Sequence, residues 1–256
     1  DTDSADTFLV KGRGELHLAV LIETIRREGY EFEVSKPEAI TKMVDGRLME
    51  PVEDLLIDTR EEYYGVISEM LSKRQAELID MHSDGGGNVR LQYHIPTKGL
   101  IGFRSAFLTS TRGQGVLNST FLGYRPWRRD LVSTRSGVLV ASEEGKAVAY
   151  GLENTQGRGQ TFIEPGTAVY EGMIVGMNPR MQDIAVNVCK EKKRTNMRSS
   201  TADIAVKLEP PIIMSLERSL DFVAQDELVE VTPLNVRLRK KLLTQQQRLR
   251  AAARSA

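Results

Sequence analysis

The side chains best suited to chemistry in this sequence are cations gathered in one short polar run. Residues 190–198 contain a single acid, Glu191, and five basic side chains: Lys190, Lys192, Lys193, Arg194 and Arg198. Lysine and arginine neutralise phosphates, and a nearby amide such as that of Asn196 donates hydrogen bonds to phosphate or ribose oxygens. The run therefore predicts a cationic loop that binds a nucleic-acid backbone, although a charge run is also typical of a merely solvated face.

A second basic feature lies close to the end of the sequence. Arg237, Arg239 and Lys241 alternate along an expected strand, which places them on one face. Together with Lys240 they predict a second backbone contact. Residues 128–256 carry 20 basic and 15 acidic side chains, whereas residues 1–127 carry 15 and 20. Two basic features in one domain favour an RNA partner, and the scarcity of aromatic side chains favours backbone and shape recognition over reading of single bases.

The sequence lacks the residue patterns of nucleotide, metal and nucleophile chemistry. A phosphate-binding loop requires a Gly-Lys pair followed by serine or threonine, and the pair Gly145-Lys146 is followed by Ala147. The three histidines are scattered without metal-ligand spacing, and the lone Cys189 has no evident activating base. We therefore predict no catalytic, cofactor-binding or metal-binding residue, and no enzymatic activity, for this chain.

The elements that must position the cations indicate an α+β fold with three parts. In the first part, Leu18, Leu21, Ile22 and Ile25 follow the spacing of one buried helix face. Residues 30–34 then alternate as a strand. A strand–helix–strand piece of this size is too small to bury a core alone. We therefore expect a truncated ferredoxin-like piece whose partner elements lie upstream.

The middle part is predicted to be a complete ferredoxin-like domain. A glycine-rich hairpin turn is expected at residues 83–88. Apolar patterns predict strands at residues 52–58, 76–81, 89–95 and 116–122, and helices around residues 63–71 and 100–107. The resulting order β-α-β-β-α-β is that of a split βαβ fold.

The last part is predicted to be mostly β, with one helix. Ser215 is a good N-cap for that helix, and residues after Lys241 are expected to form a frayed helix or a disordered tail. Strands are expected at residues 137–142, 146–152, 161–163, 167–170, 173–177, 184–189, 228–231 and 235–239. No apolar run approaches the roughly 20 residues that span a bilayer, so no membrane contact is predicted.

Several strings in this chain resemble ribosome-associated translational GTPases. Residues 12–18 (GRGELHL) and 26–30 (RREGY) resemble the third domain of the elongation factor G group. Further strings narrow the resemblance to the BipA family, also called TypA: IPTKGLIGFR at 95–104, TNMRS at 195–199, DELVEVTP at 226–233 and VRLRKK at 236–241. The resemblance covers essentially the whole chain.

The resemblance implies a domain arrangement. Residues 1–45 are similar to part of domain III of elongation factor G, residues 46–126 to its domain V, and residues 127–256 to a carboxyl-terminal domain special to the BipA family, here with a basic tail. GTP and magnesium would bind only in a G domain that this chain lacks, and the longer parent would be a GTP hydrolase.

The resemblance also implies partners. The loop at residues 190–200 would meet 23S ribosomal RNA and aminoacyl-site transfer RNA on the 70S ribosome or its 50S subunit. Domain V would present Lys98, Arg104 and Arg112 to ribosomal RNA. The implied setting is a monomeric cytoplasmic protein linked to 50S assembly and to stress or cold adaptation.

The residues themselves leave a second hypothesis open. The β domain would then be a protein-interaction module that binds a ribosomal or stress-response protein without direct RNA contact. The basic tail would in that case only keep the protein soluble.

Overall fold

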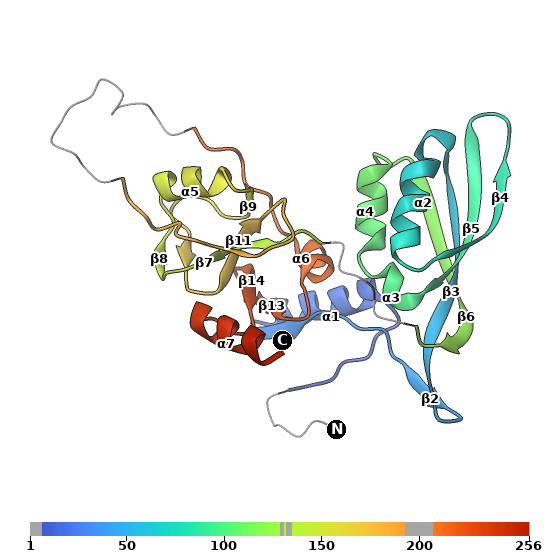
Figure 1. The fold of residues 1–256 in the computed structure, drawn as a ribbon, viewed down its shortest axis with the longest axis horizontal. Helices are drawn as coiled ribbons and strands as arrows, with labels where there is room; N and C mark the ends of the chain where they lie inside the picture. Colours follow the sequence, from blue (N-terminus) through green and yellow to red (C-terminus); the bar gives the residue numbers. More distant parts are fainter. Residues whose placement is uncertain (1–6, 129–130, 132–134, 193–206, 256) are drawn as a thin grey trace. The chain divides into compact units, whose positions relative to one another are not determined.

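Strands and helices from distant parts of the sequence combine in this mixed α+β protein (Figure 1). The computed structural model describes residues 7–128, 131, 135–192 and 207–255. Pro37–Thr134 form one unit, called here the central unit, while Asp1–Lys36 and Arg135–Ala256 together form the discontinuous unit. None of the helices described is both long enough and apolar enough to cross a lipid bilayer.

The central unit is built on one antiparallel sheet. Its strands are β2 (Lys42–Val44), β3 (Arg47–Arg60), β4 (Glu77–Ser83), β5 (Asn88–Pro96) and β6 (Gly115–Pro126). Its helices are the 3-10 turn η1 (Glu61–Tyr63), α2 (Tyr64–Lys73), α3 (Thr97–Leu100) and α4 (Phe103–Ser110). β3 pairs with both β5 and β6, β4 pairs with β5, and β2 forms a hairpin with the start of β3.

Helices α2 and α4 cover one face of this sheet (Figure 1). Alternate residues of the central strands, such as Leu55 on β3 and Leu91 on β5, point to that face and are fully buried. The helices meet them with Ile67 and Phe103, which lie on the apolar stripes of α2 and α4. The strands and helices predicted between residues 52 and 122 are present in the predicted order.

The discontinuous unit contains a mixed sheet and helices on its outside. Its strands are β1 (Phe32–Ser35), β7 (Val138–Ala141), β8 (Gly145–Lys146), β9 (Gln160–Thr161), β10 (Ala168–Val169), β11 (Met173–Met177), β12 (Ile184–Val186), β13 (Glu227–Val231) and β14 (Val236–Lys240). Its helices are α1 (Glu15–Arg27), α5 (Ala149–Gln156), α6 (Leu216–Phe222) and α7 (Gln245–Ser255). The main sheet has the order β1-β13-β14-β11-β7-β12, with β9 also paired to β11, and β8 pairs with β10 separately.

The first part of the chain shares a core with the last part. β1 pairs antiparallel with β13, in a register that sets Phe32 opposite Val231. Ile22 on α1 and Leu220 on α6 are buried in the same apolar cluster. The piece that the sequence predicts at the start of the chain therefore does not stand as a unit of its own. β13 pairs with the edge of β1, and α6 packs near α1, but of the predicted apolar stripe of α1 only Ile22 is buried and Leu21 stays exposed.

The part predicted to be mostly β contains more helix than expected. Ser215 caps α6 as predicted, because its Oγ accepts a hydrogen bond from the Arg218 backbone N–H at 3.3 Å. The strand predicted at residues 146–152 is wrong beyond Lys146, since α5 begins at Ala149. Gly151 permits α5 to lie where it does, because a Cβ there would come 2.2 Å from the Val188 carbonyl oxygen. The prediction of a single helix within the β part is also wrong, because α5 precedes α6. Helix α7 lies in the segment after Lys241, where a frayed helix or a disordered tail was predicted.

Candidate nucleic-acid interface

The cations predicted on β14 lie in different environments. Strand alternation places Lys240 on the same face as Leu238, toward the core, and Lys240 is only 2% exposed. Arg237 and Arg239 lie on the opposite, half-buried face. Lys241 follows the strand and is exposed. The four cations of the predicted second RNA contact therefore do not form one surface.

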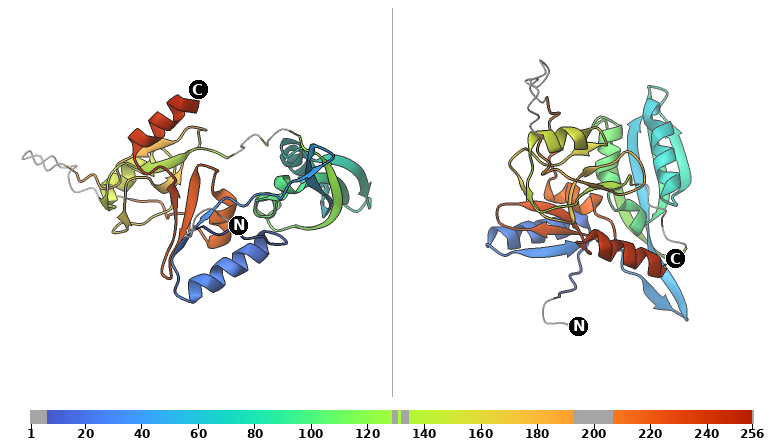
Figure 2. Two further views of the ribbon diagram at one scale, coloured as in Figure 1. Left: turned by 90° about the horizontal axis from the view of Figure 1, so that it is seen from below. Right: turned by 60° about the vertical axis from the view of Figure 1, so that its left-hand side comes forward.

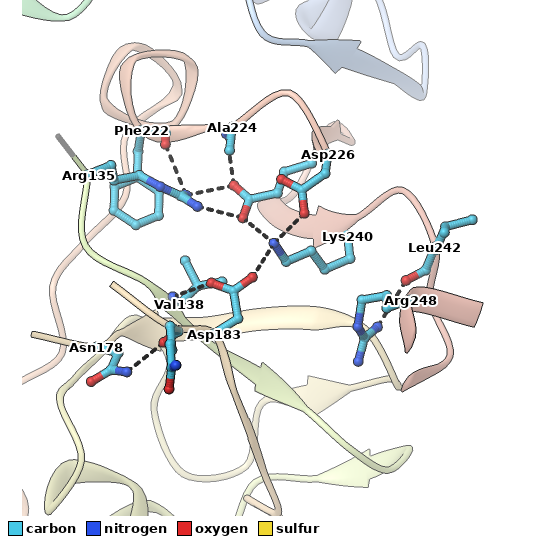
Figure 3. Close-up of polar contacts among 12 residues, drawn as sticks. Arg135, Val138, Asn178, Asp183, Phe222, Ala224, Asp226, Lys240, Leu242 and Arg248 are labelled. Carbon is cyan, nitrogen blue, oxygen red and sulfur yellow. Dashed lines mark hydrogen bonds and ion pairs between the residues drawn. The ribbon is translucent and has the colours of Figure 1, made fainter. Parts of the chain in front are cut away.

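Three carboxylates hold the ammonium of Lys240. Its Nζ lies 2.6 Å from Asp183 Oδ2, 2.7 Å from Asp226 Oδ2 and 2.8 Å from Glu227 Oε1 (Figure 3). Burial alone would lower the pKa of this ammonium, but the three carboxylates outweigh burial and raise the pKa above its ordinary value of 10.5. The acids are close enough together to ligate a metal ion, and Lys240 supplies the positive charge among them. A buried ammonium with these partners cannot reach a phosphate, so Lys240 leaves the predicted RNA-binding set.

Arg135 neutralises the same glutamate from its other side. Its Nη1 and Nη2 lie 2.7 and 2.8 Å from the two carboxylate oxygens of Glu227. The guanidinium also donates to the Phe222 carbonyl oxygen at 3.1 Å and lies 4.7 Å from the centroid of the Phe222 ring. Glu227 is fully buried, so these partners are needed to offset the cost of removing its charge from water. Arg135, Asp183, Asp226, Glu227 and Lys240 together are called here the Lys240 charge cluster, of which Glu227 and Lys240 are buried.

Arg237 and Arg239 pair with acids on the half-buried face of the sheet. Arg237 Nη1 lies 3.3 Å from Glu230 Oε1, and Arg239 Nε donates to Glu33 Oε1 at 2.7 Å. The Tyr170 hydroxyl donates to Glu230 as well. Burial is the main cause that raises the pKa of Tyr170, and the hydrogen bond to Glu230 adds to it. The phenol therefore stays neutral. A phosphate would have to compete with a carboxylate for either arginine.

The cationic run at residues 190–198 is described only at its start. Lys190 and Lys192 follow β12 and are exposed. Four of the predicted contacts lie outside the described residues: Lys193, Arg194, Asn196 and Arg198. Burial raises the pKa of the neighbouring Cys189 thiol, which disfavours its reactive thiolate.

The three cations predicted in the central unit also differ in whether an acid already pairs with them or they are exposed. Lys98 Nζ lies 2.7 Å from Oε2 of the buried Glu50 and 5.1 Å from the centroid of the Trp127 ring. Arg104 on α4 and Arg112 in the turn that follows α4 are both exposed. Of these three predicted cations, Arg104 and Arg112 are therefore the ones that a phosphate can reach.

The Lys240 charge cluster was missed by sequence reasoning, although the sequence contains a signal for part of it. Lys240 has the same strand parity as Val236 and Leu238, so a lysine stands where an apolar side chain is expected. Glu227 likewise shares parity with the buried Val229 on β13. The two residues are register partners. No comparable pattern marks Arg135 or Asp183.

Two family models match the chain in succession. The model described as the elongation factor G C-terminus matches residues 47–135, and the model described as the TypA/BipA C-terminal domain matches residues 136–245. The change from one match to the next falls where the chain passes from the central unit, which ends at Thr134, back into the discontinuous unit at Arg135.

Similar curated proteins carry the name large ribosomal subunit assembly factor BipA. The protein of Bacillus subtilis (strain 168) is 50% identical over 252 residues, which cover 98% of this chain and 41% of that protein. The protein of Synechocystis sp. is 51% identical over 240 residues, covering 94% of this chain and 40% of that protein. The protein of Escherichia coli (strain K12) is 50% identical over 252 residues, covering 98% and 42%. The chain thus spans about two fifths of the length of these relatives.

Proposed function

The chain belongs to the TypA/BipA family, and we propose that it is the ribosome-binding portion of a factor that assists assembly of the large ribosomal subunit. The observation that carries this proposal is the 50% identity, along 98% of the chain, to proteins named as large ribosomal subunit assembly factors. Because the chain spans only part of those relatives, GTP hydrolysis is proposed for the longer protein, with GTP and magnesium in a G domain outside these 256 residues.

The domain arrangement is part of the proposal. The central unit would correspond to domain V of elongation factor G and residues 1–45 to part of its domain III. The strand order β6-β3-β5-β4, with α2 and α4 on one face, supports a ferredoxin-like description of the central unit. Residues 127–256 would be the domain special to the family.

The proposed mechanism is electrostatic docking on 23S ribosomal RNA, with aminoacyl-site transfer RNA as a further contact. Lys190 and Lys192 are exposed at the start of the cationic run, and Arg104 and Arg112 are exposed on the central unit. Such cations release counterions when they meet phosphates, which gives binding without any chemical step. The setting we propose is a monomeric cytoplasmic protein with a role in 50S assembly under stress or in the cold.

A second candidate is a module that contacts a ribosomal protein and not RNA. The observation that favours it is internal neutralisation, because carboxylates already pair with Lys98, Arg237, Arg239 and Lys240. Both candidates predict binding to intact 50S subunits. Only RNA docking predicts binding to 23S ribosomal RNA stripped of protein.

Co-sedimentation of the 256-residue chain with purified 50S subunits and with protein-free 23S ribosomal RNA, across a salt series, tests the proposal. We expect binding to both, with an affinity that falls steeply as salt rises. Binding to 50S subunits alone would support the protein-contact candidate. Absence of binding to 50S subunits would refute the ribosome-binding proposal.

A further inference from the structure

Helix α7 is fixed to the discontinuous unit through its first turn. Thr244 and Gln247 form a capping box: the Gln247 N–H donates to Thr244 Oγ1 at 3.2 Å, and the Thr244 N–H donates to Gln247 Oε1 at 3.3 Å. The carboxylate of Glu171 accepts a hydrogen bond from the Gln245 N–H at 2.9 Å, where the helix dipole favours negative charge. Arg248 turns back and donates to the Leu242 carbonyl oxygen at 2.9 Å (Figure 3). The start of α7 is therefore held in a defined place.

Beyond this first turn, α7 is exposed and carries only positive charge. Figure 2 shows the helix on the outside of the discontinuous unit, with the carboxyl terminus at its far end. The side chains of Arg250 and Arg254 are exposed, and neither forms an ion pair with any residue that the structure describes. The helix sequence contains no acid. Because they are four residues apart, the two arginines share one face and lie about 6 Å apart along the axis.

The chemistry of this face suits a polyanion better than a protein groove. A helix that docks into a protein groove presents an apolar stripe, whereas Leu249 is the one large apolar side chain of α7. The alanines at 251–253 are small and leave room for a backbone to approach the helix. Charge complementarity therefore identifies phosphates as the partner groups.

We propose that α7 is an RNA-contacting surface in which Arg250 and Arg254 each neutralise a backbone phosphate of ribosomal RNA. The inference rests on the proposed ribosome binding and deepens it by locating a contact. It adds a contact to the one predicted at residues 237–241, where Lys240 is buried, Arg237 and Arg239 are paired with acids, and Lys241 is exposed. The arginines Arg250 and Arg254 of α7 are exposed, whereas the cations of β14 are paired with carboxylates of the same unit.

The test is the double variant Arg250→Gln/Arg254→Gln in the 256-residue chain. Glutamine has a helix propensity close to that of arginine, so α7 should be retained. The matched control is Arg158→Gln/Arg218→Gln, which removes the same charge from two exposed positions of the discontinuous unit outside α7. Affinity for protein-free 23S ribosomal RNA and for 50S subunits is measured over a salt series, and far-ultraviolet circular dichroism reports helix content.

We expect the α7 variant to bind RNA roughly tenfold or more weakly near 0.1 M salt, with the slope of log affinity against log salt reduced by about 2. The control variant should match the unaltered chain in slope. An unchanged slope in the α7 variant, while the unaltered chain binds RNA, would overturn the inference and leave the ribosome-binding proposal standing. Equal losses in both variants would also overturn it, because net charge alone would then explain binding. Failure of the unaltered chain to bind 50S subunits would instead remove the proposed function.

Discussion

The Nζ of Lys240 on β14 lies 2.8 Å from Oε1 of Glu227 on the neighbouring strand β13, and both side chains are buried. The two residues are register partners in the β13–β14 pair. With Arg135 bound to the other side of Glu227, the pair connects the start of the segment 135–256 to its last strand. A lysine that the sequence assigns to RNA is thus a structural counter-charge.

Replacing Lys240 with methionine should destabilise the discontinuous unit by about 3 kcal/mol. This value is at the low end for breaking a buried ion pair, because Arg135 still neutralises Glu227. Equilibrium unfolding in urea measures the loss. The control is Lys241→Met at the exposed neighbouring position, where a change within about 0.5 kcal/mol is expected. Equal stability of the two variants would contradict the internal role of Lys240.

Alkaline pH should weaken the fold through the same lysine. Burial opposes its charge, but the carboxylates prevail and raise the pKa of Lys240 above 10.5. A group with a raised folded pKa stabilises the fold fully below its unfolded pKa and loses that contribution as pH rises through the folded value. The free energy of unfolding should therefore fall as pH rises past 10.5. Lys240→Met should flatten this decline.

The raised pKa of Tyr170 acts in the same direction, because the folded state keeps its proton above the ordinary value of 10.0. Tyr170→Phe therefore serves as the control for the pH series. If Tyr170→Phe removes the whole decline and Lys240→Met removes none of it, the lysine is not responsible.

Gly151→Ala should destabilise the protein although it lies inside a helix. Alanine normally stabilises a helix interior by about 1 kcal/mol over glycine. Here the new Cβ would lie 2.2 Å from the Val188 carbonyl oxygen, so a loss of about 1–3 kcal/mol is expected from overpacking. Gly157→Ala just after α5 is the control, since a Cβ there would lie 3.6 Å from its nearest neighbour, the Asn154 carbonyl oxygen. Thermal unfolding of both variants measures the difference. A Gly151→Ala variant more stable than the unaltered chain would contradict the close contact between residue 151 and the Val188 carbonyl oxygen.

Alanine at all five cations of the run 190–198 should sharply weaken ribosome binding and flatten its salt dependence. The positions are Lys190, Lys192, Lys193, Arg194 and Arg198. If each meets a duplex phosphate, the slope of log affinity against log salt should fall by about 4 to 5. Filter binding to 23S ribosomal RNA measures the slope. Unchanged affinity and slope would refute the assignment of this loop.

The 256-residue chain is expected to hydrolyse no GTP above the buffer rate. The reason is that the sequence contains no Gly-Lys pair followed by serine or threonine, which a phosphate-binding loop requires. Phosphate release from GTP measures this directly. Clear turnover that co-purifies with the chain would show a nucleotide site that the sequence motifs do not reveal.

Local sequence patterns were enough to predict the helices and strands, especially in the central unit. Periods of 2 and 3.6 residues are properties of short segments, so Leu55 and Leu91 mark strands and Ile67 and Phe103 mark helices without knowledge of the fold. The Ser215 cap is also local, because its partner Arg218 is three residues away. Strings along the whole chain were sufficient to indicate the family.

Which cations remain accessible depends on contacts between segments that are distant in the sequence. Alternation along β14 tells which face Lys240 occupies, but not that Asp183 and Asp226 meet it there, since those contacts depend on the order of strands in the sheet. The pairing of β1 with β13 likewise joins segments at opposite ends of the sequence, and no local pattern specifies that partner. A charge that is free in the sequence becomes internal when folding places a carboxylate beside it, because burying either charge alone costs too much.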